Sequence, residues 1–458
     1  MRRKIYEKLL KWKNESAGKT CLLVEGARRI GKSYIVEEFA KREYSSYILI
    51  DFYKADEDVK SLFMNNLNDL DSFFMFLSAI YNKKLYKNES LIIFDEVQFC
   101  PQARAAIKYL VADGRYHFIE TGSLLSIKEN TENIMIPSEE RHLKMYPMDF
   151  EEFLWARNNL IAMDMIKDAY LNHKMLDDGI HRKMMQLFRE YMTIGGMPQA
   201  VEAFNSGATF NQVDKIKQNI IKLYEEDLNK NNDNGKATKI YKSVPNQLGK
   251  NKKRFNMTCI SKNSRFREYQ ESIDFVEQSM IVNECNNVSD PGILLELSKV
   301  EEKFKLYMGD TGLLITCIAN SNETLNEDIY KLLLRDKVSD NLGMIYENVV
   351  AQILRSMGYK LYFHEFYDKK INKKDNGEDT IISKKYEIDF IIVKNKKLCP
   401  IEVKSGLSNK HTSFDMFKNK YQLKIQDKYV IHCNNYKEED GITYLPIYML
   451  PCINDISK

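Results

Sequence analysis

The chain has 458 residues, 44% of them hydrophobic and 29% charged, which is typical of a folded protein of about three domains. The formal net charge is only +3, so the chain as a whole has no general attraction to nucleic acid, and any basic surface must be local. The longest apolar runs fall far short of a membrane span and the basic N-terminus lacks an apolar signal segment, which predicts a cytoplasmic protein without membrane contact.

Strand and helix signals alternate through the first 160 residues. Short apolar stretches predict four strands, and an amphipathic stretch at 32–43 predicts a helix. This alternation is typical of a parallel α/β sheet. The four predicted strands lie at 20–26, 45–53, 90–96 and 115–123.

The stretch GARRIGKS follows the first strand, precedes the helix and fits the pattern GxxxxGK[ST]. Gly26 and Gly31 let the backbone curl around a phosphate, and the helix start adds its positive dipole end. We expect Lys32 to reach the β- and γ-phosphates and the Ser33 hydroxyl to bind Mg²⁺. A glycine turn with a capping serine is the alternative, which the flanking strand and helix disfavour. The expected nucleotide-binding loop is Gly26, Ala27, Arg28, Arg29, Ile30, Gly31, Lys32 and Ser33.

The third predicted strand ends in a carboxylate pair. Asp95 is placed to bind the same Mg²⁺, and we expect Glu96 to polarise the attacking water. The pair favours ATP. Thr121 ends the next strand, where it either senses the γ-phosphate or simply caps the strand end. Asp149 and Glu152 have the spacing of a helix capping box, which we favour over a catalytic role.

Helical patterns replace the strands from about residue 147 to residue 225. They break at Gly195–Pro198, where a helix stop meets a proline that suits the next helix start. After an Asn- and Gly-rich linker, residues 236–267 contain ten Lys or Arg and no Asp or Glu. This segment either holds a phosphate backbone or is a solvated face, and its helical and short apolar pieces suggest a winged-helix-like module.

Residues 385–406, KYEIDFIIVKNKKLCPIEVKSG, predict a hairpin with a two-residue Asn-Lys turn. Counting outward from this turn pairs Asp389 with Glu402 and Glu387 with Lys404, all on one face of the sheet. A salt bridge to Lys404 explains Glu387 well. It does not explain Asp389 opposite Glu402, because two close carboxylates repel unless a cation or a proton lies between them.

Mg²⁺ bound by Asp389 and Glu402 would explain the facing pair. Lys404 would then orient or deprotonate a water, or stabilise charge on a phosphate. A one-residue slip in register would separate the two carboxylates. Glu347 lies on the edge of the apolar stripe of a preceding helix. It either faces the sheet or is a first-turn glutamate that the helix dipole favours.

Nine stretches, which span nearly the whole chain, resemble prokaryotic AAA+ superfamily ATPases with a C-terminal domain of the PD-(D/E)XK nuclease type. They are GARRIGKS, FDEVQFCPQA, ETGSLL, MYPMDFEEFLWA, YMTIGGMPQAV, FKLYMGDTGLL, IYENVVAQIL, EIDFII and IEVKSG. The resemblance implies that ATP binds at the loop and at the Asp-Glu pair. It also implies a nuclease-like core in which four side chains meet: Glu347, Asp389, Glu402 and Lys404.

The sequence therefore predicts an α/β protein: a P-loop parallel sheet, a helical lid, a winged-helix-like module and a restriction-endonuclease-like α/β domain. The expected boundaries are 1–160, 161–228, 229–335 and 336–458. The leading hypothesis is an ATP-hydrolysing enzyme that acts on DNA through a Mg²⁺-dependent nuclease-like domain. One alternative is an ATP-driven switch or loader whose C-terminal domain binds nucleic acid or a partner without cutting. Another is a translocase, which would require an oligomer.

Overall fold

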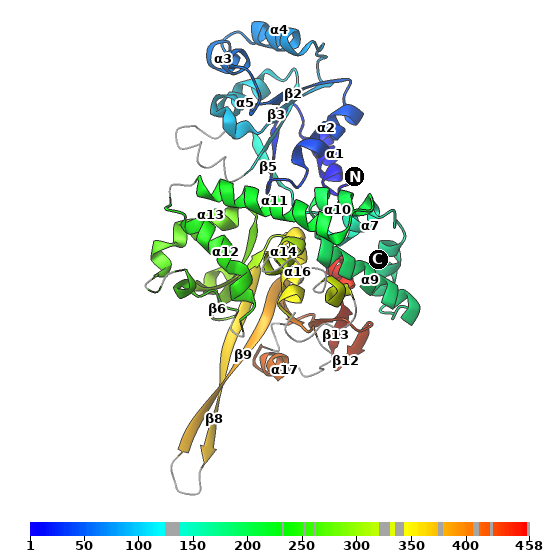
Figure 1. The fold of residues 1–458 in the computed structure, drawn as a ribbon, viewed down its shortest axis with the longest axis vertical. Coiled ribbons are helices and arrows are strands. Elements are labelled where there is room, and N and C mark those ends of the chain that lie inside the picture. The colour runs from blue at the N-terminus through cyan, green and yellow to red at the C-terminus, as the bar shows by residue number, and fades with distance from the viewer. Residues whose placement is uncertain are drawn as a thin grey trace.

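Two β-sheets joined by a helical layer make up the molecule (Figure 1). A five-stranded parallel sheet lies at one end and a mixed eight-stranded sheet at the other, with the long helix α11 (Phe210–Asn229) crossing between them. The computed structural model describes residues 1–123, 138–230, 233–250, 253–260, 262, 264–319, 330–334, 343–373, 379–405, 412–421 and 425–455. In these ranges no helix combines the length and the apolar character needed to cross a bilayer.

The first sheet has the order β2-β3-β4-β1-β5 and is parallel throughout. Its strands are β1 (Cys21–Glu25), β2 (Ser46–Asp51), β3 (Ser90–Asp95), β4 (His117–Gly122) and β5 (Glu140–Lys144). Four of them confirm the predicted strands. The fifth, β5, was missed because it is a largely exposed edge strand with the charged sequence ERHLK, so it lacks an apolar signal.

Helices cover both faces of this parallel sheet. Alternate residues of β1 and β3 pack into two separate apolar clusters, one with α1 and α2 and the other with α3, α4 and α5. Burial on both faces explains why the central strands are continuous apolar runs. The helices are α1 (Ile5–Glu15), α2 (Lys32–Glu43), α3 (Glu57–Asn65), α4 (Leu70–Tyr81) and α5 (Pro101–Asp113).

A buried charged cluster fixes β5 beside β1. Arg104 donates two hydrogen bonds to Glu140, at 2.9 and 2.7 Å, and His142 lies 3.0 Å from Glu140 and 3.1 Å from Glu25. Burial and the charge of Glu140 raise the pKa of Glu120 well above its usual range. Burial alone would raise the pKa of Glu140 too, but hydrogen bonds from Arg104 and His142 lower it to about 2. Because Glu25 directly precedes the glycine-rich loop, this cluster also fixes where the loop begins.

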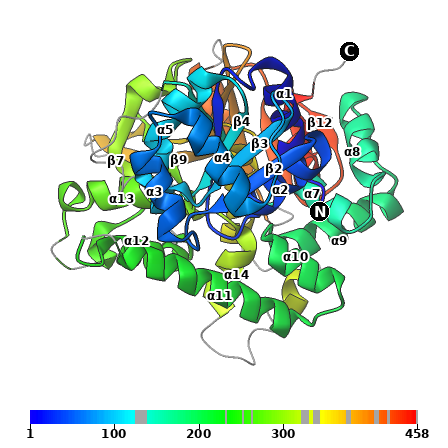
Figure 2. The ribbon, with the colours of Figure 1, turned by 90° about the horizontal axis from the view of Figure 1, so that it is seen from above.

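The middle layer is helical, and its first helix begins at the predicted capping box. Asp149 accepts the backbone N–H of Glu152 at 2.9 Å, and the Glu152 carboxylate accepts the N–H of Asp149 at 3.1 Å. Figure 2 looks down on the parallel sheet and shows α11 beside it, packed against α10 and α12. The helices are α7 (Phe150–Ala156), α8 (Ala162–Leu171), α9 (Asp178–Ile194), α10 (Pro198–Asn205), α11 and α12 (Lys236–Leu248).

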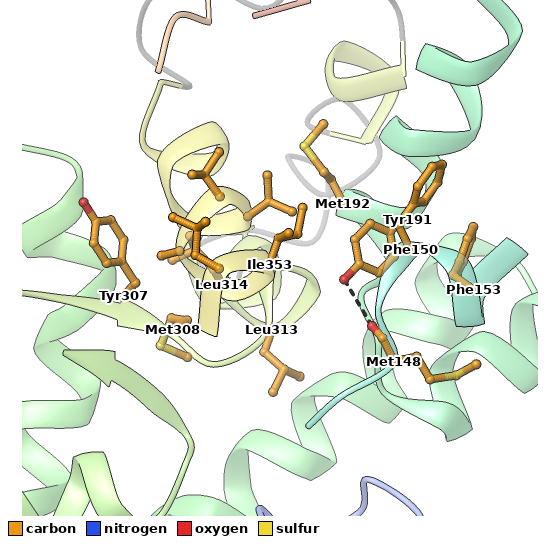
Figure 3. Packing of buried hydrophobic residues seen from close by; sticks show 14 of the residues in the cluster. Met148, Phe150, Phe153, Tyr191, Met192, Tyr307, Met308, Leu313, Leu314 and Ile353 are labelled. Atoms are coloured by element: carbon orange, nitrogen blue, oxygen red, sulfur yellow. Dashed lines mark hydrogen bonds between the residues drawn. The ribbon is translucent and has the colours of Figure 1, made fainter. Parts of the chain in front are cut away.

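The turn between α9 and α10 is a point of close backbone approach. Gly196 donates its N–H to the buried carboxylate of Asp310 at 2.6 Å. A Cβ on Gly196 would lie 2.2 Å from the carbonyl oxygen of Met148, and Tyr191 donates its hydroxyl to that same oxygen at 3.1 Å. Figure 3 shows this junction, with side chains of α7 and α9 on one side and those of β7, α14 and α16 on the other.

The second sheet is mixed and has the order β12-β13-β11-β10-β9-β8-β6-β7. Its strands are β6 (Val282–Val288), β7 (Lys299–Met308), β8 (Leu361–Lys373), β9 (Asp379–Lys394), β10 (Lys397–Val403), β11 (Tyr429–His432), β12 (Lys437–Glu439) and β13 (Ile442–Pro446). Further helices in the described residues include α13 (Gln270–Gln278), α14 (Thr311–Ala319), α16 (Gly343–Ser356) and α17 (Thr412–Tyr421). The far ends of β8 and β9 pair with each other and extend beyond the body as an arm (Figure 1).

Strands β6 and β7 belong to the part expected to form a winged-helix-like module. They do not form a separate sheet, because β6 pairs in parallel with β8. The expected boundary at 335/336 lies outside the described residues, and the winged-helix assignment stays a prediction. The chain is therefore an α/β protein with a five-stranded parallel sheet, a helical middle and a C-terminal mixed α/β sheet.

We predict that Gly196→Ala lowers the melting temperature, because the added methyl group would overlap the backbone of Met148. Overpacking of this kind costs about 1–3 kcal/mol. The matched control is Gly292→Ala, since nothing lies within 4 Å of a Cβ built there. Thermal unfolding followed by circular dichroism measures both variants, and equal melting temperatures would contradict the close approach.

We predict a pH-dependent contribution of His142 to stability. Hydrogen bonds to Glu140 and then Glu25 raise the pKa of His142 to about 9 in the folded chain, above its value of about 6.5 in an unfolded one. The stabilisation is therefore complete below the unfolded pKa and is lost as the pH rises through about 9. The melting-temperature difference between wild type and His142→Gln should be large at about pH 6 and vanish by about pH 10. A difference that is constant over this range would exclude the charged pairing.

Candidate functional site

The glycine-rich loop connects β1 to α2, as predicted. Gly31 has a φ of 91°, and α2 begins at the next residue, so the positive end of its dipole lies at the loop. Lys32 donates to the carbonyl oxygens of Gly26 at 3.0 Å and Ala27 at 2.9 Å. Burial lowers the pKa of Lys32 to about 8. A phosphate in the loop would give this buried ammonium an anionic partner and favour its charged form.

Ser33 and Asp95, the two expected Mg²⁺ residues, come together beneath the loop. The Ser33 hydroxyl donates to Asp95 Oδ1 at 2.7 Å, and Thr121 donates its hydroxyl to the same oxygen. A hydroxyl beside a carboxylate is the donor set that a P-loop supplies to Mg²⁺, so these residues fit the ion. Thr121 contacts the Asp95 carboxylate, and its two predicted roles stay predictions.

A cavity of about 610 Å³ opens in front of these residues, within the size range of small-ligand sites. Its walls come from the N-terminus, the glycine-rich loop, the ends of β2 and β3, and the start of α10. The lining residues are Met1, Arg3, Arg28, Arg29, Gly31, Lys32, Ser33, Tyr34, Asp51, Tyr53, Lys54, Asp95, Glu96, Phe99, Pro198, Gln199 and Glu202. Ile30 is buried beneath the loop, where its carbonyl accepts a hydrogen bond from Arg3 at 2.8 Å.

Glu96 lies on the cavity wall just beyond Asp95. Its backbone has a φ of 53°, a left-handed conformation that is uncommon for a glutamate. Gln98 donates its side-chain N–H to the Glu96 carboxylate, and the Glu96 N–H donates to Thr121 Oγ1 at 3.4 Å. Its neighbours thus hold the carboxylate at the edge of the cavity, where a water could be activated.

The loop is also tied to α11, a contact that the sequence did not suggest. Arg28 donates to both carboxylate oxygens of Asp227, at 2.8 and 2.9 Å. Tyr224 donates its hydroxyl to the carbonyl oxygen of Arg28 at 2.9 Å. One wall of the cavity is therefore held directly by the long helix of the middle layer.

The register predicted for the C-terminal hairpin is confirmed near its turn. Asn395 and Lys396 have φ values of 49° and 60°, as a two-residue type I′ turn requires. The antiparallel pairs run from Lys394–Lys397 to Phe390–Ile401. Asp389, the next residue of β9, accepts the backbone N–H of Val403 at 2.8 Å instead of continuing the ladder.

Beyond Ile401 the predicted pairing fails, because β10 leaves β9 and continues beside β11. The expected contact between Glu387 and Lys404 is therefore wrong. Lys305 of β7 binds Glu387 at 2.6 Å, and Lys404 binds Glu402 at 2.6 Å. The buried Lys305 lies far away in the sequence, and no local pattern marked it.

Glu347 faces the sheet and is buried, which confirms one of its two predicted placements. Tyr307 donates its hydroxyl to Glu347 Oε2 at 3.2 Å, and Lys253 forms an ion pair with Oε1. Burial, followed by the charges of Glu402 and Glu347, raises the pKa of Asp389 well above its usual range. The carboxylates are thus close enough to interact electrostatically.

The fit of this site to a metal is incomplete. Within the described part of the chain, no group of three or more His, Cys, Asp or Glu is arranged to hold an ion. Glu402 Oε2 is buried without a hydrogen-bond partner among the described residues, which suits a cation. Both oxygens of Glu347 are engaged by protein groups, Lys253 and Tyr307.

Three family models match separate parts of the chain. An AAA domain matches residues 18–154, and two domains of unknown function, DUF8612 and DUF4143, match residues 185–324 and 342–450. The uncharacterized protein MJ1637 of Methanocaldococcus jannaschii is 24% identical over 134 residues, which cover 27% of this chain and 27% of that protein.

Two solved structures align with large parts of the chain at low sequence identity. A Walker-type ATPase of Pyrococcus abyssi aligns with 69% of this chain and 95% of its own, at 13% identity and a TM-score of 0.42. The protein VC1899 of Vibrio cholerae aligns with 90% of this chain and 89% of its own, at 11% identity and a TM-score of 0.14. The AAA match coincides with the glycine-rich loop and its cavity, so the chain carries an AAA-type P-loop ATPase domain, with DUF4143 at its C-terminal end.

Proposed function

We propose that this chain is a Mg²⁺-dependent ATP hydrolase. We further propose that the nucleotide bound in the cavity changes the position of elements next to the C-terminal sheet. The observation that carries the proposal is the 2.7 Å contact between Ser33 and Asp95 beneath the loop that holds Lys32. Ser33 and Asp95 would hold Mg²⁺, which supplies charge neutralisation between the β- and γ-phosphates when it is bound. Lys32 would exchange its two backbone carbonyl partners for phosphate oxygens.

Glu96 is the proposed general base. It is the carboxylate that follows Asp95 on the cavity wall, and Gln98 fixes its orientation. A base in this place takes a proton from the attacking water while Lys32 stabilises the charge on the phosphate. Arg29 also lines the cavity and would add positive charge near the phosphates.

Contacts on two helices support coupling of this cavity to the C-terminal sheet. Pro198, the first residue of α10, lines the cavity, and Gly196 just before it donates to Asp310. Gln352 donates to the same Asp310 carboxylate at 3.5 Å and lies on α16, the helix that also carries Glu347. A shift of α10 on nucleotide binding would therefore be transmitted to α16, the helix that supplies Glu347 to the carboxylate site.

The second proposed activity is metal-dependent cleavage of DNA by the C-terminal domain. It is favoured by the buried Glu402 oxygen without a partner, with Asp389 beside it and Lys404 two residues further along the chain. This arrangement resembles a restriction-endonuclease-like site. Asp389 and Glu402 are the proposed metal ligands, Lys404 is the proposed catalytic lysine, and Glu347 is the proposed third carboxylate.

We predict that Glu96→Gln keeps ATP affinity but lowers kcat by about 10²–10⁴-fold, the contribution of a general base. Lys32→Ala should instead lose ATP binding, because the loop then lacks its buried cation. Phosphate release and titration calorimetry separate the two effects, and Glu57→Gln, at an exposed residue that does not line the cavity, is the control with unchanged values. A wild-type kcat for Glu96→Gln would place the base elsewhere.

We predict that supercoiled and linear DNA are cut in the presence of Mg²⁺ or Mn²⁺, and that Asp389→Asn reduces the rate by at least about 100-fold. Asp440→Asn is the matched control, because the left-handed φ of 53° at Asp440 also suits asparagine. Reactions with and without ATP, and with Lys32→Ala, report the coupling. Intact ATPase activity without cleavage under any condition would favour a switch or loader that binds nucleic acid or a partner without cutting.

A further inference from the structure

We propose that Lys253 is a built-in cation that keeps the carboxylate site closed, and that a divalent metal enters when a nucleic-acid backbone draws this lysine away. The inference rests on the second activity proposed above. It assigns a regulatory role to a residue outside the C-terminal sheet, and it names the partner that would release the site.

Lys253 is the cation paired with Glu347, the proposed third carboxylate. Its ammonium pairs with Glu347 Oε1, while Tyr307 holds Oε2 at 3.2 Å. The Lys253 side chain is 24% exposed, whereas that of Glu347 is only 7% exposed. The lysine can therefore leave toward solvent, and the carboxylate would stay where it is.

Two other lysines contact carboxylates of this region. Lys305 lies in β7, is fully buried and binds Glu387. Lys404 follows β10, and its backbone N–H is bonded to the carbonyl oxygen of Ile431 at 2.8 Å. Lys253 instead lies between α12 and the next described helical turn, outside any strand. Among these three lysines, it is the one that pairs with Glu347.

Removal of Lys253 would leave negative charge that needs compensation. Glu347 Oε1 would lose its partner near the buried, unpartnered Glu402 Oε2 and near Asp389. Buried carboxylates without a counter-charge are costly. A divalent ion would supply two positive charges to oxygen ligands of the kind that Mg²⁺ and Mn²⁺ prefer.

The segment around Lys253 is built to respond to phosphate. Arg254, Lys262, Arg265 and Arg267 are exposed on it, and residues 236–267 contain no acidic residue. The phosphates of a nucleic-acid backbone bind Lys and Arg side chains, and this binding weakens strongly as the salt concentration rises. Such phosphates would compete with Glu347 for the Lys253 ammonium.

The movement required of Lys253 is small. Phe255, two residues later, is buried, stacks on Phe304 with a centroid distance of 5.4 Å and donates its N–H to the Phe304 carbonyl oxygen at 2.8 Å. This anchor keeps the rest of the segment in place. Rotation of the Lys253 side chain with a local backbone shift is then enough to open the site.

Titration of the full chain with Mn²⁺ alone, followed by calorimetry, tests the inference. We expect Lys253→Met to bind Mn²⁺ at least about tenfold more tightly than wild type, because a competing positive charge is removed. Asp389→Asn should abolish this binding, and Lys253→Arg should restore the wild-type affinity. Lys250→Met, which removes an exposed lysine of the same segment, is the matched control with no change. Lys253→Gln replaces the methionine variant if that chain does not fold.

A short random-sequence DNA duplex provides the second arm of the test. It should tighten Mn²⁺ binding to wild type at low salt and leave the affinity of Lys253→Met unchanged. Equal Mn²⁺ affinities in wild type and Lys253→Met, both dependent on Asp389, would overturn the role of Lys253 and leave the metal site standing. Absence of Asp389-dependent Mn²⁺ binding in either protein would overturn both proposals.

Discussion

The hydrogen bonds to the Asp310 carboxylate are the contacts on which the arrangement of the helical layer and the C-terminal sheet depends. This carboxylate is buried, and burial raises its pKa, although N–H groups of Gly196 and Leu313 donate to it. Those hydrogen bonds offset the cost of removing a carboxyl group from water. Gly196 lies in the turn before α10, and Gln352 belongs to α16. The Asp310 side chain therefore connects the wall of the nucleotide cavity to helix α16.

Local chemistry made the nucleotide loop and the hairpin turn predictable. A glycine-rich loop between a strand and a helix depends on residues that are adjacent in sequence, and the left-handed turn at Asn395 and Lys396 does so too. The strand β5 could not be predicted from the sequence, because an exposed edge strand needs no apolar run. The capping box at Asp149 could also be found, since its two partners are three residues apart.

The carboxylate site was only partly predictable, for a different physical reason. Counting residues outward from a turn is valid only while the two strands stay paired, and the ladder between β9 and β10 ends at Ile401. The cations that complete the site come from Lys253 and Lys305, which are distant in sequence from the hairpin. No periodicity connects such residues, so their role becomes visible only when the sheet brings them together.

The pairing of β6 with β8 limits which parts of the molecule can turn against each other. Their parallel ladder runs from Cys285–Leu361 to Asn287–Phe363, so strands from the middle of the chain and from its end share one rigid surface. A rotation that separated them would break backbone hydrogen bonds that water could not replace inside the sheet. The mixed sheet is therefore one unit built from both parts of the chain, and the helical layer lies between it and the parallel sheet (Figure 1).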